Sequence, residues 1–98
     1  MRFAHAIRHL ADILRHVGSA AEAAHYYEEA LKVYRQHSES RPLDLANTLR
    51  GFALLKGGIG ESEGANSLWQ EARSLYESVH VQAGVEESER EIARLRAK

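Results

Sequence analysis

Apolar residues recur every three or four positions along most of the chain, which is the spacing of one face of an α-helix. The first such stripe consists of Phe3, Ile7, Leu10, Ala11, Leu14 and Val17. Four more stripes follow, centred near Tyr27, Leu49, Trp69 and Ile92. A single proline and 15 alanines favour helix over strand. The pattern therefore predicts an all-α chain of five helices joined by short turns.

Glycine and proline mark where the predicted helices begin and end. Gly18 and a group of glycines after residue 56 stand where left-handed residues would close the first and third helices. Ser19, three residues before Glu22, predicts a capping box at the start of the second helix. Pro42 is tolerated only near the start of a helix, so we expect the third helix to begin there.

The chain repeats itself with a shift of 42 residues, which aligns residues 2–36 with 44–78 without a gap. Identical pairs include Gly18/Gly60 and Tyr34/Tyr76, and the aromatic residues Tyr27 and Trp69 fall in the same register. Chance similarity between two amphipathic hairpins is the alternative explanation, and the ungapped register argues against it. Because one helical hairpin cannot cover its own apolar face, stacked copies in a solenoid are the physical solution.

This repeat resembles the tetratricopeptide repeat, a helical hairpin with bulky, small and aromatic residues at fixed places. The first unit carries the signature at Ile7, Leu10, Ala11, Leu14, Gly18, Ala23, Tyr27 and Ala30. The second unit carries it at Leu49, Phe52, Ala53, Gly60, Ala65, Trp69 and Ala72. The 42-residue spacing looks like the kinesin light chain-like variety rather than the compact form of about 34 residues.

The resemblance implies a superhelical solenoid of two helical hairpins and a capping helix, in one domain over residues 1–98. We expect repeat one at about 2–36, repeat two at about 44–78 and the capping helix at about 81–97. The last segment has many charges and a thin apolar stripe, which suits a cap with one face in water. The first helix has Phe3 in its stripe and no such polar face. Either the chain is part of a longer array, or this end pairs with another copy.

In tetratricopeptide arrays the first helix of each hairpin lines a concave groove, and the resemblance implies the same surface here. Helical phasing places Arg8 and Asp12 on this side of the first helix, and Asn47 and Arg50 on this side of the third. Guanidinium groups at equivalent places can hold a carboxylate or the carbonyls of an extended peptide. We therefore expect these four residues to contact a protein or peptide ligand. The alternative is that the arginines are solvated or paired within the chain.

Six histidines raise the question of a metal site. His5 and His9 are four residues apart on one helix face, so they are candidates to share an ion, although solvent-facing histidines without a ligand are the simpler interpretation. The chain has no cysteine, no zinc-protease motif and no spacing that suggests a catalytic triad. We therefore expect a non-enzymatic protein with no catalytic residue, cofactor or metal.

Composition and charge limit the kinds of partner that we expect the chain to bind. The chain has 13 basic and 14 acidic residues, so it lacks the basic field that nucleic-acid binding needs. No apolar run approaches the roughly 20 residues of a membrane span, and the amino terminus lacks the core of a secretory signal. We expect a cytoplasmic scaffold that binds a protein or peptide and neither nucleic acid nor membrane. The alternative is a self-associating module that forms a homodimer through its first helix.

Overall fold

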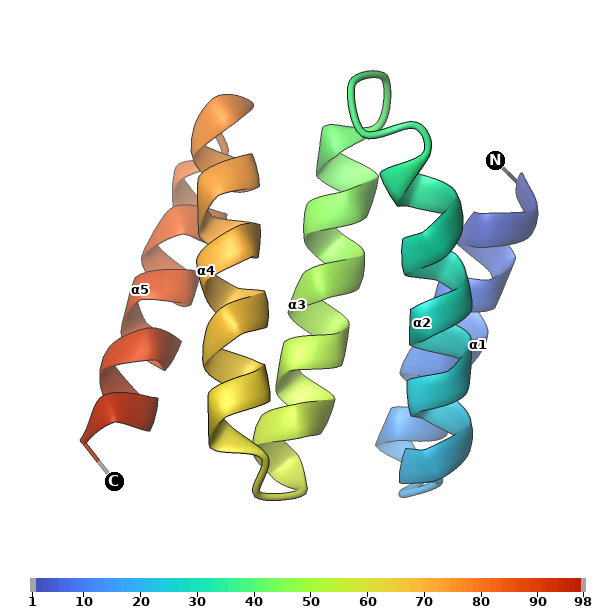
Figure 1. The fold of residues 1–98 in the computed structure, drawn as a ribbon, viewed down its shortest axis with the longest axis horizontal. Coiled ribbons are helices and arrows are strands. Elements are labelled where there is room, and N and C mark those ends of the chain that lie inside the picture. Colours follow the sequence, from blue (N-terminus) through green and yellow to red (C-terminus); the bar gives the residue numbers. More distant parts are fainter. Residues whose placement is uncertain (1, 98) are drawn as a thin grey trace.

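The computed structural model describes residues 2–97, which fold into five helices and contain no strand (Figure 1). Their bounds are α1 Arg2–His16, α2 Ala20–Arg35, α3 Pro42–Gly58, α4 Ser62–Ser78 and α5 Gln82–Arg96. The all-α expectation is therefore confirmed. Within the described range, no helix is both long and apolar enough to cross a membrane.

The helices stack in the order of the chain, with α1 at one edge of the molecule and α5 at the other (Figure 1). Helices α1 and α2 form one antiparallel hairpin, and α3 and α4 form the second. Helix α3 packs against α2 and also touches α1, and α5 packs against α4. The first helices of the two hairpins are thus neighbours, as the predicted solenoid with a terminal capping helix requires.

Equivalent turns close the first helix of each hairpin. Gly18 and Gly60 have φ angles of +86° and +85°, the left-handed conformation that favours glycine. Ser19 follows at the N-cap of α2, but its side chain makes no capping hydrogen bond. Its ψ of 69° departs from the extended conformation that aims an N-cap side chain at the first turn. The predicted capping box is therefore wrong.

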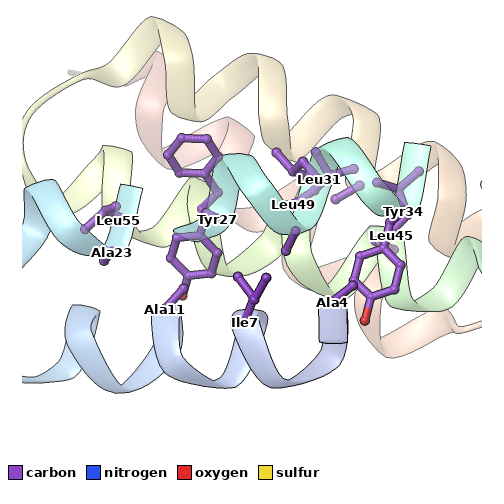
Figure 2. Close-up of a cluster of buried hydrophobic side chains, with 14 of the residues drawn as sticks. Ala4, Ile7, Ala11, Ala23, Tyr27, Leu31, Tyr34, Leu45, Leu49 and Leu55 are labelled. Atoms are coloured by element: carbon purple, nitrogen blue, oxygen red, sulfur yellow. The ribbon is translucent and has the colours of Figure 1, made fainter. Parts of the chain in front are cut away.

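A buried aromatic residue from the second helix of each hairpin organises the core. Tyr27 of α2 lies against the α1 face that carries Ile7 and Ala11 (Figure 2). Its ring also stacks on Phe52 of α3, with the ring centroids 5.5 Å apart. Trp69 holds the equivalent position in α4 and belongs to a second buried cluster, whose other members are Ala53, Ala65 and Leu95. Helix α5 therefore covers the second hairpin much as α3 covers the first.

Two glycines allow helices to approach these aromatic rings closely. A Cβ atom on Gly51 of α3 would lie 2.7 Å from the Tyr27 hydroxyl oxygen and 2.9 Å from a carboxylate oxygen of Asp12. A Cβ atom on Gly84 of α5 would overlap the ring of Tyr76 in the same way. The junction between α2 and α3 and the junction between α4 and α5 thus each require a residue without a side chain.

The apolar side chains of α1 are only partly buried. Phe3 is 71% exposed, whereas its repeat equivalent Leu45 is 3% exposed. Ile13 is 59% exposed, whereas its equivalent Leu55 is 5% exposed. The remaining exposed members of the stripe are Leu10 and Val17. Helix α2 covers the outer side of α3, and within residues 2–97 no helix does the same for α1.

Candidate functional site

The four predicted contact residues lie on α1 and α3, the first helices of the two hairpins. Asp12 accepts a hydrogen bond from the hydroxyl of Tyr27, which itself accepts one from Arg15 Nε at 3.0 Å. Arg8 Nη1 lies 3.9 Å from Asp12 Oδ2. The carboxylate of Asp12 is therefore fixed by a buried phenol below it and by two guanidinium groups beside it.

The second hairpin also has a phenol that reaches the polar surface, at a different position of the repeat. The Tyr76 hydroxyl of α4 donates to Asn47 Oδ1 at 2.6 Å. Arg50 donates through Nε and Nη2 to the two carboxylate oxygens of Glu87 in α5, at 2.6 and 2.9 Å. Bidentate pairs of this kind hold both side chains in one orientation. The polar surface of α1, α3 and α5 is thus anchored by phenols that reach it from α2 and α4.

Burial keeps the hydroxyl groups of Tyr27 and Tyr76 protonated, so both remain hydrogen-bond donors. Loss of solvent is the largest cause that raises the pKa of Tyr27 to about 12, and the hydrogen bond to Asp12 adds to it. Loss of solvent also raises the pKa of Tyr76 to about 12. The hydrogen bond to Glu87 raises the pKa of Arg50. At neutral pH the phenols are therefore protonated and the guanidinium group of Arg50 is charged.

The structure brings the predicted residues together in two pairs, Arg8 with Asp12 and Asn47 with Arg50 one turn apart on α3. It also gives each arginine a carboxylate neighbour within the chain. Pairing within the chain is thus observed for Arg50, and at a longer distance for Arg8. The contacts of these four residues with a ligand stay a prediction.

His5 and His9, the candidate metal pair, lie with their Nε2 atoms 3.1 Å apart and their rings edge to face. Across residues 2–97, no group of three histidine, cysteine or acidic side chains is arranged to hold an ion. The two imidazoles contact each other and Arg8, whose Nη2 lies 3.4 Å from His5 Nδ1. The observed role of His5 is therefore a hydrogen-bonding one.

Tyr34, at the end of α2, is a residue that the sequence reasoning assigned only to packing. Its hydroxyl is buried, and within the described range its O–H finds no acceptor. Its repeat equivalent Tyr76 donates to Asn47, and the residue equivalent to Asn47 is His5. The repeat alignment shows histidine in the first unit where the second unit has asparagine. This exchange is the sequence signal from which the missing acceptor could have been predicted.

Stacked helical hairpins with a 42-residue period and polar groups held on their first helices define a helical-repeat scaffold. A family model described as tetratricopeptide repeat matches residues 2–78, so the chain belongs to the tetratricopeptide repeat family. Such repeats generally mediate protein–protein interaction and are generally non-enzymatic.

The chain is also similar to a curated protein, the kinesin light chain-related protein 3 of Arabidopsis thaliana. The two are 34% identical over 68 residues, which cover 68% of this chain and 10% of the relative. The chain thus spans about a tenth of the length of the curated relative it matches. This similarity agrees with the kinesin light chain-like spacing of the repeat. No solved structure matches the chain.

The paired tyrosines allow a direct test of the hydrogen bonds under the polar surface. Tyr76→Phe leaves Asn47 without its donor, so we expect the free energy of unfolding to fall by about 0.5–1.5 kcal/mol. Tyr34→Phe removes a buried O–H that has no acceptor, so we expect the free energy of unfolding to stay the same or to rise. Urea unfolding at pH 7, followed by circular dichroism, measures both. An equal loss of stability in the two variants would contradict this assignment of partners.

Proposed function

We propose that the chain is a non-catalytic scaffold that binds a segment of a protein partner on its concave polar surface, across α1 and α3. The observation that carries this proposal is the anchoring of Asp12 and Asn47 by buried phenols. A surface whose polar groups are already oriented loses less side-chain entropy when a ligand docks. Membership of a family that generally mediates protein–protein interaction supports the same function.

A ligand would be recognised by the arginine N–H groups that the intramolecular ion pairs do not occupy. Arg50 contacts Glu87 through Nε and Nη2, and its Nη1 takes no part in that pair. This nitrogen can donate to a backbone carbonyl of an extended peptide. A ligand carboxylate could instead compete with Glu87 for the whole guanidinium group. Arg8 is more deeply placed and would contribute mainly positive charge.

Removal of these charges should weaken partner binding. We expect Arg8→Gln/Arg50→Gln to retain about a tenth or less of the proteins that the unaltered chain captures in a pull-down, because charged hydrogen bonds are lost. The matched control is Arg35→Gln/Arg94→Gln, which also removes two arginines from ion pairs, with Glu71 and Glu91. Circular dichroism checks that both variants fold. Equal capture by the two double variants would contradict the groove assignment.

A second candidate function is self-association through α1, and we propose it on one observation. Four large apolar residues of this helix are exposed: Phe3, Leu10, Ile13 and Val17. The repeat equivalents of the first three, Leu45, Phe52 and Leu55, are buried against the preceding hairpin, whereas Ile59, the equivalent of Val17, is exposed. A two-fold axis beside α1 would place the same apolar row of a second copy against it and form a homodimer.

Sedimentation equilibrium separates the two candidates. For self-association we expect the unaltered chain to sediment at twice its monomer mass of 11.0 kDa, and Ile13→Glu/Val17→Glu to sediment as a monomer because it charges the contact. Ile59→Glu, at an exposed apolar residue at the end of α3, is the control and should remain a dimer. A monomeric unaltered chain at high concentration would rule out the homodimer.

A further inference from the structure

Tyr34 carries a buried hydroxyl that its surroundings do not use. The side chain is 1% exposed, and among residues 2–97 no group accepts a hydrogen bond from its O–H. Figure 2 shows this oxygen beside Ala4, at the start of α1, and turned away from the other labelled side chains. A buried phenol without a partner costs free energy, so a group that accepts its hydrogen bond would be stabilised there.

The comparison of the two repeats explains why this hydroxyl is left over. In the second hairpin, Tyr76 donates to Asn47 of α3. In the first hairpin, the equivalent position holds His5, whose Nδ1 is engaged by Arg8 and whose Nε2 is engaged by His9. His5 thus has no ring nitrogen left to accept a hydrogen bond from Tyr34. The first hairpin keeps the donor of the repeat and lacks its acceptor.

Tyr34 is one of the residues that line a pocket of about 280 Å³ between the starts of α1 and α3. Its lining residues are Arg2, His5, Tyr34, Arg41 and Asp44. Asp44 Oδ2 lies 3.8 Å from Arg41 Nη1, so the single carboxylate of the lining is partly compensated and Arg2 adds a second positive charge.

Arg8 supplies a further donor close to this pocket. Its Nε is buried and has no acceptor within the described part of the chain. Burial, the largest cause, and the charge of Asp44 raise the pKa of Tyr34 above its ordinary value, whereas the charge of Arg8 and a hydrogen bond from its side chain lower that pKa by less. The hydroxyl is therefore neutral at pH 7 and remains a hydrogen-bond donor.

We propose that this pocket binds an oxyanion, a carboxylate or a phosphate, that accepts the hydrogen bond of Tyr34 and is neutralised by Arg2 and Arg41. An oxyanion has several acceptor sites and no donor, which matches a lining of unpaired donors and arginines. The oxyanion can be an acidic side chain, the end of a peptide chain or free phosphate. The proposal does not depend on partner binding in the groove, because inorganic phosphate alone tests it.

The experiment is a titration of the ¹⁵N-labelled chain at pH 7, followed by the backbone amide signals. The probes are sodium phosphate, acetyl-Gly-Glu-Gly-amide, acetyl-Gly-Gly-Gly with a free carboxylate, and acetyl-Gly-Gln-Gly-amide as the neutral control. We expect at least one anionic probe to shift the amides of residues 2–8 and 42–45, and the neutral peptide to shift none. The anionic probe that binds best identifies the source of the oxyanion.

The variants show whether the pocket or the general charge of the surface is responsible. We expect Tyr34→Phe to raise the Kd of that probe about tenfold, as the loss of a charge-assisted hydrogen bond predicts, and Arg2→Gln to raise it as well. Tyr26→Phe, which removes another hydroxyl from α2, and Arg94→Gln, which removes a charge from α5, should leave it unchanged. The proposal is overturned if no anionic probe binds, if Tyr34→Phe binds as the unaltered chain does, or if Arg94→Gln weakens binding as much as Arg2→Gln.

Discussion

The contact between Tyr27 and the backbone of α3 is the constraint on which the arrangement of the two hairpins depends. The ring is fully buried, stacks on Phe52 and reaches within contact distance of Gly51. Its hydroxyl binds Asp12 and Arg15 of α1. One side chain of α2 thus joins three helices. Because α3 can approach only where Gly51 has no side chain, this contact also fixes the rotation of the second hairpin against the first.

The same constraint determines the polar surface. The phenol of Tyr27 passes between helices and ends at Asp12, so the packing of the core orients a carboxylate of α1. Tyr76 does the same for Asn47, and Arg50 is held by Glu87 of α5. Binding groups on this face are therefore positioned by the core itself. The two repeats share a backbone plan but differ in the residues at its polar end, and these differences give each hairpin its own chemistry.

Much of the fold could be predicted because helix period and repeat register are local properties of a sequence. The five helices and the left-handed Gly18 and Gly60 follow directly from them. The missing polar face of the first helix pointed to an uncovered apolar surface, but not to which of its residues are exposed, since the burial of a first helix depends on the hairpin before it rather than on its own pattern.

The site was less predictable for a related reason. The groove positions of Arg8 and Arg50 follow from helical phase, but the pairing of Arg50 with Glu87 joins residues 37 positions apart. Contacts of that range depend on how α5 packs, which no local pattern encodes. The missing acceptor for the Tyr34 hydroxyl could be predicted in part, because the aligned repeats show His5 where the second repeat has Asn47.

The most direct test of the central contact compares two glycines of α3. A methyl group at Gly57 meets only Ala65, at 3.9 Å, so Gly57→Ala should raise the free energy of unfolding by about 0.5–1 kcal/mol through better helix propensity. Gly51→Ala gains the same propensity but forces Tyr27 and α3 apart, so we expect a net loss of about 1–3 kcal/mol in urea unfolding. A Gly51→Ala variant as stable as Gly57→Ala would contradict the account.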